Sequence, residues 1–359
     1  MSSKLFSPIK FRNLECQNRV VVAPMCQYSA TDGVAGDWHL MHLGHLSLGG
    51  AGLLICEATG VSADGRITPG CLGLYSDETE AALKHVIDFC HDVGSAHFAV
   101  QLAHAGRKAS TSVPWLGGGK PLSTEDGAWP TIAPSAVPFT EGWHVPMAMD
   151  RAQMDRVRDD FVAATHRCAR IGVDLIELHM AHGYLLCEFL SPIANRRDDA
   201  YGGTLENRMR FPLEVFKAVR DAWPEDKPLG VRVSATDWDT PGITIAESVI
   251  FSRALKELGC DFIDCSTGGN SPNRPPVGNG EQGYQVTFAR QIRTEAGIPT
   301  IAVGKILDAD YAESVIADGA ADMVALARGM LQDPRWAWHA AAKLDAEAAY
   351  PPQYARSKP

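Results

Sequence analysis

The sequence predicts a single α/β domain folded as a (β/α)8 barrel. Eight short apolar segments recur along the 359 residues, rich in Val, Ile and Leu and with little polar alternation. That composition is typical of parallel strands buried on both faces. Longer amphipathic segments separate the strands without interruption, which favours a closed barrel over an open doubly wound sheet. A barrel of this kind accommodates the whole chain, so we expect residues 1–359 to form one domain.

The eight expected strands lie at residues 19–24, 52–58, 96–102, 173–179, 229–234, 261–266, 299–303 and 323–327. Five helices are expected between them, at residues 77–93, 150–171, 206–223, 244–258 and 308–317. Most of these helices open with an acidic residue, and a glycine or proline stands at or near each end. Both features are helix start and stop signals.

Two segments fall outside the repeat. Residues 6–18 precede the first strand and are expected to form a hairpin that plugs the barrel floor. Residues 108–148 form a long insertion after the third strand, with three consecutive glycines and the tryptophans Trp115, Trp129 and Trp143. A loop of that length is usually a lid or a binding loop. The alternative is a surface excursion whose buried tryptophans form a small core of their own.

Composition and charge exclude several classes of protein. The formal charge is −10 and the acidic residues are scattered, which argues against a nucleic-acid surface or a membrane-surface helix. Nine cysteines, an odd number without a Cys-x-x-Cys pair, predict reduced thiols. No signal-peptide core and no apolar run near the ~20 residues of a membrane span occurs. We therefore expect a cytoplasmic protein with no membrane or nucleic-acid partner.

Several common catalytic motifs are missing. No Gly-x-Gly-x-x-Gly follows a predicted strand, which argues against a Rossmann dinucleotide domain. Neither His-Glu-x-x-His nor Gly-x-Ser-x-Gly is present. The chemistry is therefore sought at the carboxyl ends of the strands, where barrel enzymes place it.

The last two strands end in residues suited to phosphate. Gly304-Lys305 follows the seventh strand, and Ala327-Arg328-Gly329 follows the eighth. Barrels often bind phosphate with these two loops, because glycine lets backbone N–H groups approach the ligand. Arg328 adds a fork-shaped cation that fits phosphate oxygens. The alternative is that the glycines serve ordinary turns and Arg328 caps a helix.

A second group of polar residues ends the fourth strand. His179 is the last residue of that strand. His182 follows three residues later, and Tyr184 lies two residues after His182. Two imidazoles there are able to hold a metal or to donate two hydrogen bonds to one oxygen. Zinc sites need three or four ligands and no matching set stands out, so paired donors that polarise a carbonyl or nitro group are favoured over buried histidines without a role. Tyr184 then supplies a weak acid with an ordinary pKa of about 10.

Taken together, these residues resemble the Old Yellow Enzyme family of ene-reductases, in particular its bacterial thermophilic-like branch of xenobiotic reductases and NADPH dehydrogenases. The matching motifs are residues 23–28 (APMCQY), 101–108 (QLAHAGRK), 179–185 (HMAHGYL), 189–192 (FLSP), 197–208 (RDDAYGGTLENR) and 327–328 (AR). The resemblance runs from about residue 5 to the C-terminus. Two departures are Ala327, where many members have glycine, and Ala355, where relatives often carry an aromatic residue.

The resemblance implies a barrel that holds FMN non-covalently at its C-terminal face. The cofactor-binding residues it implies are Ala23, Pro24, Met25, Cys26, Ala58, Gln101, Arg232, Gly304, Ala327 and Arg328. Gln101 would contact the pyrimidine edge of the flavin, and Arg232 would place positive charge near N1 and O2. Gly304, Ala327 and Arg328 would hold the phosphate. Cys26 would tune the flavin potential without a covalent bond.

The resemblance also implies the substrate site. His179 and His182 would bind the electron-withdrawing oxygen, Tyr184 would be the proton donor, and Cys26 and Tyr28 would touch the substrate. Residues 345–359 resemble a tail that reaches a neighbouring subunit, so Arg356 would act in a second copy's site. A homodimer or homotetramer is expected on that ground alone.

The implied reaction is a ping-pong reduction. NADPH or NADH delivers hydride to flavin N5 and leaves. The reduced flavin then passes hydride to the β-carbon of an α,β-unsaturated aldehyde, ketone, imide or nitroalkene, and Tyr184 protonates the α-carbon. Three alternatives remain: a dienoyl-CoA reductase or amine dehydrogenase type of flavin barrel, a metal-dependent or phosphosugar barrel, and a barrel kept as a scaffold. The first carries an iron–sulfur cysteine cluster and a further domain, whereas no cysteine follows residue 330 here.

Overall fold

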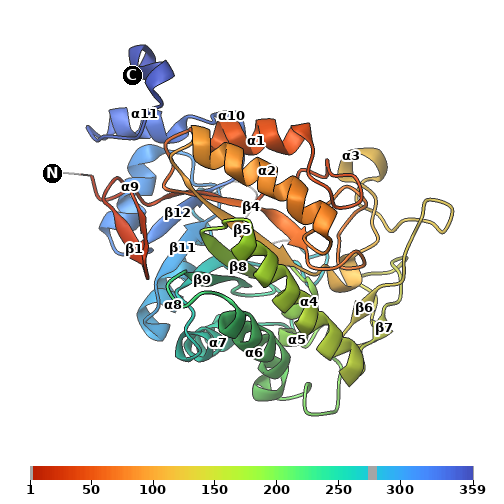
Figure 1. The fold of residues 1–359 in the computed structure, drawn as a ribbon. Coiled ribbons are helices and arrows are strands. Elements are labelled where there is room, and N and C mark those ends of the chain that lie inside the picture. Colours follow the sequence, from red (N-terminus) through yellow and green to blue (C-terminus); the bar gives the residue numbers. More distant parts are fainter. Residues whose placement is uncertain (1–2, 274–280, 359) are drawn as a thin grey trace.

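The structure, a computed structural model, describes residues 3–273 and 281–358. Eight parallel strands close into a barrel in which the order along the chain is also the order around the barrel (Figure 1). The strands are β3 (Val20–Val22), β4 (Leu53–Gly60), β5 (His97–Ala103), β8 (Leu175–Met180), β9 (Leu229–Ser234), β10 (Phe262–Ser266), β11 (Thr300–Val303) and β12 (Met323–Leu326). Each predicted strand overlaps one of them, so the predicted (β/α)8 barrel is confirmed.

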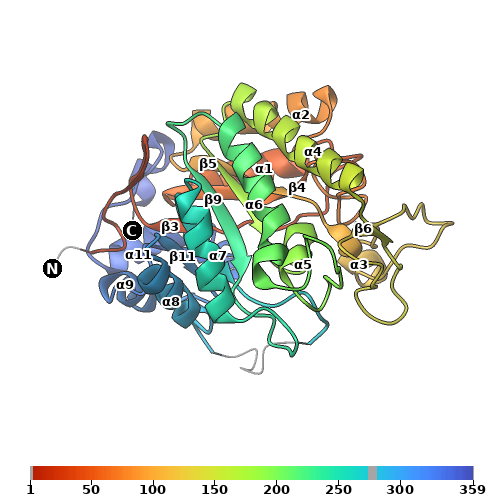
Figure 2. The same ribbon diagram turned by 90° about the horizontal axis from the view of Figure 1, so that it is seen from below.

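Helices surround the barrel. They are α1 (Asp37–Ser47), α2 (Asp77–Val93), α3 (Pro114–Gly117), α4 (Arg151–Arg170), α5 (Leu185–Leu190), α6 (Leu205–Ala222), α7 (Ile245–Glu257), α8 (Val286–Ala296), α9 (Ala309–Ala317), α10 (Arg328–Gln332) and α11 (Trp336–Lys343). Figure 2 shows α4, α6, α7 and α8 following one another around one flank, and successive members of this series pack together.

All five predicted helices are present with ends within one residue of those expected. Their starts follow from side-chain caps: Asp150, Thr244 and Asp308 each accept a hydrogen bond from a backbone N–H in the first turn. The other described helices were not predicted, and α1 and α8 are the longest of them. Their N-caps, Gly36 and Gln285, form no side-chain cap bond, so the sequence carries no strong start signal there.

The barrel floor is closed by the predicted hairpin. Strands β1 (Ile9–Phe11) and β2 (Leu14–Cys16) pair antiparallel. The ring of Phe11 packs against that of Phe262, at the start of β10, with 5.5 Å between centroids. Because Phe262 lies at the amino end of its strand, the hairpin covers the end of the barrel opposite the strand carboxyl ends.

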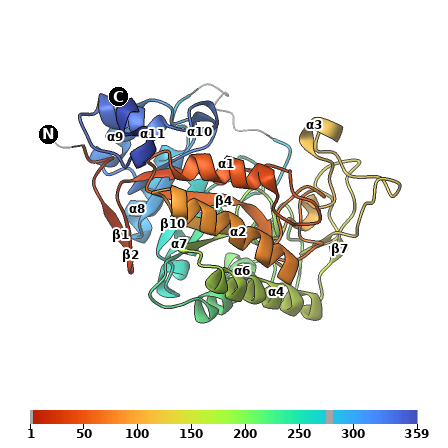
Figure 3. The ribbon, with the colours of Figure 1, turned by 45° about the horizontal axis from the view of Figure 1, so that its top comes forward.

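The insertion at residues 108–148 lies at the end of the molecule away from both termini (Figures 1 and 3). It follows the single turn η1 (Gly106–Lys108) and contains α3 and the two-residue strands β6 (Ile132–Ala133) and β7 (Met147–Ala148). Trp115 is 64% exposed and the other two tryptophans are half-buried. The alternative of a separate tryptophan core is therefore wrong.

The C-terminal tail lies beside α11. Its last turn, η2 (Pro352–Ser357), is exposed, and the Tyr354 ring stacks on the Arg335 guanidinium at 5.0 Å from the ring centroid. Pro359, the last residue of the predicted tail, lies outside the described residues. None of the described helices combines the length and the apolar composition needed to cross a bilayer. All nine cysteines are free thiols, as predicted, and only Cys26 is not fully buried.

Candidate active site

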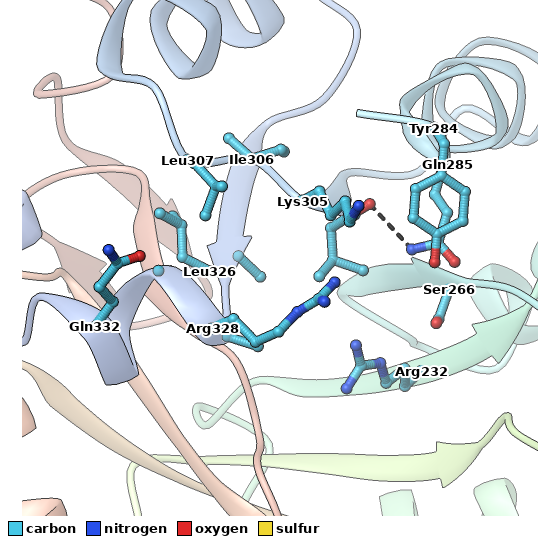
Figure 4. A pocket seen from close by; sticks show the side chains of 15 residues that line it. Arg232, Ser266, Tyr284, Gln285, Lys305, Ile306, Leu307, Leu326, Arg328 and Gln332 are labelled. Atoms are coloured by element: carbon cyan, nitrogen blue, oxygen red, sulfur yellow. Dashed lines mark hydrogen bonds between the residues drawn. The ribbon is translucent and has the colours of Figure 1, made fainter. Parts of the chain in front are cut away.

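A cavity of about 380 Å³ opens at the carboxyl ends of β11 and β12. Four residues that the sequence assigned to the cofactor line it: Arg232, Gly304, Ala327 and Arg328. Figure 4 shows the side chains of Arg232 and Arg328 directed into the same cavity. The structure therefore brings together cations from β9 and from the start of α10, which are almost a hundred residues apart in the chain.

One end of the cavity is built for a close backbone approach. Gly304 has a φ of +131°, a conformation that side chains other than glycine rarely adopt. A Cβ there would lie 3.2 Å from the side-chain nitrogen of Gln285 and 3.3 Å from the Tyr284 ring. The Arg328 side chain is exposed and lines the cavity. Lys305, which sequence reasoning left without a role, adds a further cation to this lining.

Inside the barrel, Arg232 is flanked by residues of the neighbouring strands. It pairs in register with His179 on β8 and with Asp264 on β10. Its Nε lies 3.1 Å from a carboxylate oxygen of Asp264, and both side chains are buried. One layer deeper, the Gln101 amide nitrogen donates to Glu177 at 2.7 Å. The sequence analysis singled out neither Asp264 nor Glu177. Strand periodicity shows which side chains point into the barrel, but it does not show which of them come into contact.

His179 and His182 form the predicted pair, with ring centroids 5.1 Å apart. The Nδ1 atom of His179 accepts from the backbone N–H of Ala181 at 3.2 Å, which leaves Nε2 as its donor. Nε2 of His182 lies 2.6 Å from the Ser266 hydroxyl oxygen. Burial lowers the pKa of both histidines well below 6.5, and Arg232 lowers it further. Both rings are therefore neutral and carry one N–H each, which in His182 lies on Nδ1 when Nε2 accepts from the Ser266 hydroxyl.

The turn that presents these rings depends on two backbone contacts. His182 has a φ of +59°, and a Cβ on Gly183 would lie 2.1 Å from the carbonyl oxygen of Gly269. The Lys108 ammonium group donates to the carbonyl oxygens of His182 at 2.7 Å and of Gly269 at 3.1 Å. Lys108 thus ties the loops after β5, β8 and β10 together. Lys108 belongs to the motif at residues 101–108, but the sequence alone indicated no role for it.

Tyr184 lies at the N-cap of α5, and its ring packs edge-on against His179 at 4.8 Å. The Lys108 ammonium group lies 5.2 Å from the centre of the same ring. Burial raises the pKa of the phenol well above 10, and the neighbouring Cys26 and Tyr28 add to that rise. The Tyr184 phenol is therefore protonated at neutral pH, because burial disfavours its charged form.

The loop after β3 brings Cys26 and Tyr28 to the same place. Its backbone is held by a hydrogen bond from Gln27 N–H to Glu57 on β4, at 2.9 Å. Burial and the Glu57 charge raise the pKa of the Cys26 thiol well above 9, so it stays protonated. The Tyr28 ring meets Trp115 of the insertion edge-on at 5.8 Å.

The remaining residues predicted to contact the cofactor or the substrate lie either near the barrel strands or in the C-terminal tail. Ala23, at the head of the β3 loop that continues through Pro24 and Met25, donates its N–H to Leu326 on β12 at 3.0 Å. Ala58 is buried beside a register shift in β4. Arg356, in contrast, lies in exposed η2 at the end of the molecule away from the insertion (Figure 3). The structure of one chain does not bring Arg356 to the histidine pair.

Comparison with known proteins identifies the class. A family described as NADH:flavin oxidoreductase / NADH oxidase matches residues 4–347, and the chain belongs to this family. An NADPH dehydrogenase of Geobacillus thermodenitrificans is 42% identical over 358 residues, which are 99% of either chain. The protein is thus an oxidoreductase of the Old Yellow Enzyme type, as the motifs predicted.

Solved structures support the same assignment. Morphinone reductase superposes with a TM-score of 0.79 and 28% identity, over 98% of this chain and 93% of that one. Histamine dehydrogenase from Rhizobium sp. 4-9 has a TM-score of 0.77 and 28% identity, but this chain spans only 47% of it. Membership of this family argues against the alternatives of a metal-dependent barrel enzyme, a phosphosugar barrel enzyme and a barrel kept as a scaffold.

Proposed function

We propose that this protein is an FMN-dependent ene-reductase. In this proposal it takes hydride from NADPH or NADH and reduces the activated C=C bond of α,β-unsaturated aldehydes, ketones, imides or nitroalkenes. The observation that carries the proposal is the arrangement of two neutral imidazoles and a phenol beside a cavity lined by two arginines. Membership of a flavin oxidoreductase family supplies the redox class.

The residues present fit FMN. Arg328, Gly304 and Ala327 offer a cation and accessible backbone at one end of the cavity, which suits a phosphate. Arg232 and Gln101 present a guanidinium and an amide inside the barrel, which suit the polar edge of a flavin ring. When bound, the flavin supplies the hydride, which it receives from the nicotinamide.

His179 and His182 would bind the oxygen of the alkene substrate. Each neutral ring donates one N–H, and two donors converging on one oxygen withdraw electron density from the conjugated double bond. Neutrality matters here, since an imidazolium beside Arg232 would meet an unfavourable like charge. Ser266 holds His182, and the Ala181 N–H holds His179, so neither ring has to reorganise when the substrate binds.

Tyr184 would deliver the proton to the α-carbon. Its raised pKa keeps the phenol protonated at neutral pH, so the proton is present when the substrate arrives. The nearby Lys108 ammonium group would favour the phenolate left behind, before a proton from solvent restores the phenol. One hydride and one proton together saturate the bond.

A second copy of the chain would complete the site. In this part of the proposal Arg356 enters the substrate pocket of a neighbouring subunit in a homodimer or homotetramer. The exposure of η2, away from the histidine pair of its own chain, is compatible with that role. The insertion at residues 108–148 would cover the pocket as a lid, since Trp115 already meets Tyr28.

The first experiment tests whether the protein contains FMN. The purified protein should be yellow, release FMN on denaturation and lose its colour with NADPH under anaerobic conditions. A colourless protein that FMN cannot reconstitute would exclude the proposed function.

The second experiment separates the two half-reactions. We expect Tyr184→Phe to slow alkene reduction by roughly 10²–10⁴-fold and to leave flavin reduction by NADPH nearly intact. In parallel, His179→Ala and His182→Ala should weaken the binding of a phenol. Equal losses in both half-reactions would show that Tyr184 is not the proton donor. Unchanged phenol affinity in both histidine variants would show that the two histidines are not the paired hydrogen-bond donors.

A further inference from the structure

Two buried carboxyl groups lie beside Arg232, and the mechanism above uses neither. Asp264 on β10 and Glu177 on β8 are each 0% exposed. Carboxylates are rarely buried completely unless they are paired, because ionisation in a low-dielectric interior is costly. The complete burial of both carboxyl groups inside the barrel therefore requires a physical explanation.

Strand register places both groups on the inner face of the barrel. Asp264 is the direct neighbour of Arg232, and Arg232 is the direct neighbour of His179. Glu177 comes two residues before His179, so its side chain points the same way one layer deeper. There it accepts the amide hydrogen bond of Gln101, its partner in register on β5.

One guanidinium thus faces two carboxyls. Burial raises the pKa of both carboxyl groups, to about 8 for Glu177, while Arg232 opposes the rise at each. The charge of Asp264 adds to the rise at Glu177, because two interacting carboxyls in a buried interior cannot both ionise at low cost. Asp264 lies 3.1 Å from the guanidinium, whereas Glu177 accepts a hydrogen bond from the uncharged Gln101 amide. The ion pair therefore belongs to Asp264.

We propose that Asp264 is a positioning residue that sets the strength of the positive charge Arg232 presents to the flavin, while Glu177 stays uncharged beside it. This inference rests on the proposed function, which places the flavin ring over Arg232. The Asp264 carboxylate lies 3.1 Å from Nε of Arg232, where it offsets part of the guanidinium charge. Glu177 orients the Gln101 amide with its nitrogen toward Glu177.

The consequence concerns the balance of the two half-reactions. A positive charge beside the ring favours the reduced flavin, which helps the enzyme accept hydride and hinders it from giving hydride away. An unscreened Arg232 would hold the reduced state too strongly. Asp264 lowers that preference, so that one site serves both the nicotinamide and the alkene.

The test measures the bound flavin without turnover. In the FMN-loaded protein, Asp264→Asn should raise the midpoint potential and lower the sulfite dissociation constant by roughly tenfold, since a charge within a few ångströms is removed from a poorly screened interior. For a two-electron couple a tenfold change corresponds to about 30 mV. Asp264→Glu, which keeps the charge, should return both values toward those of the unchanged protein.

Glu177→Gln provides the matched comparison. It keeps the shape and an acceptor oxygen for Gln101, so at pH 7 we expect the potential and sulfite affinity to stay unchanged. A raised potential in Glu177→Gln would overturn the assignment, and it would do so even if Asp264→Asn failed to fold. An unchanged potential in folded, FMN-loaded Asp264→Asn would overturn it too. Absence of FMN from the unchanged protein would instead refute the proposed function.

Discussion

The hydroxyl oxygen of Ser266 lies 2.6 Å from Nε2 of His182, and Ser266 also lines the cavity that Arg232 and Arg328 enter. Ser266 closes β10, whereas His182 follows β8, so this contact joins the proposed substrate site to the proposed cofactor site. It also holds the imidazole in one orientation before any substrate arrives.

Ser266→Ala should therefore loosen His182. A hydrogen bond of this kind contributes about 1 kcal/mol, so we expect phenol affinity to fall roughly fivefold. FMN affinity should change little, because Arg328 and Arg232 are untouched. Calorimetry with a phenol and with FMN checks both expectations, and Ser266→Thr, which keeps the hydroxyl, should restore phenol binding. A normal phenol affinity in Ser266→Ala would contradict the role.

Lys108→Met should destabilise the active-site loops. The change leaves the carbonyl oxygens of His182 and Gly269 without their donor, at a cost of about 1–3 kcal/mol in the free energy of unfolding. Alkene reduction should fall more than reduction by NADPH, because Tyr184 loses its neighbouring cation. Denaturant unfolding and stopped-flow measurement of each half-reaction test this. Lys120→Met, an exposed lysine in the same insertion, is the control and should match the unchanged protein.

Arg328→Ala should weaken FMN selectively. Removing a cation that meets a phosphate costs about 1.5–3 kcal/mol, which is roughly 10–100-fold in affinity. Riboflavin lacks the phosphate, so its affinity should stay constant. Fluorescence titration of the apoprotein with both ligands gives the comparison, with Gln332→Ala as a neutral control from the same cavity lining. Equal losses for FMN and riboflavin would place Arg328 away from the phosphate.

A cluster outside the site predicts pH-dependent stability. A carboxylate oxygen of Asp174 lies 3.0 Å from Nε2 of His91 and 3.7 Å from Nδ1 of His97. The Asp174 carboxylate raises the pKa of both histidines above 6.5, through a hydrogen bond to His91 and through its negative charge near His97. Partial burial opposes ionisation of Asp174, but the two histidines and the Phe98 N–H prevail and lower its pKa below 3.8.

The sign of the pH effect follows. The folded protein holds protons on His91 and His97 that the unfolded chain releases from about pH 6.5, so the stabilisation fades as pH rises through the raised histidine values. It also fades in acid, as pH falls below 3.8 through the lowered value of Asp174. The cluster is half-exposed, so we expect about 1 kcal/mol or less.

Asp174→Asn tests this expectation. Its destabilisation should be largest near pH 5–6 and shrink toward pH 9, measured by urea unfolding at several pH values. Asp221→Asn, which breaks an exposed pair with Lys217, should have an effect that does not change over that range. A constant difference between Asp174→Asn and the unchanged protein would show that the histidines do not carry the effect.

Much of the fold could be predicted because its signals are local. Runs of Val, Ile and Leu mark strands buried on both faces, and Asp150 and Thr244 mark helix starts through bonds within one turn. Helix α8 escaped prediction because its start has no side-chain cap. The insertion after the third strand was predicted, whereas the alternative of a tryptophan core was wrong, because Trp115 is exposed.

The sequence by itself determined the barrel, the residue types at the strand ends and the family, because these depend on periodicity and on motifs read along the chain. Only the tertiary structure decided that Lys108 meets the carbonyl of His182, that Ser266 meets its ring and that Asp264 meets Arg232. The physical reason is that these contacts join separate strands and loops. Their distances, and the pKa values that follow from burial, exist only once the barrel has closed.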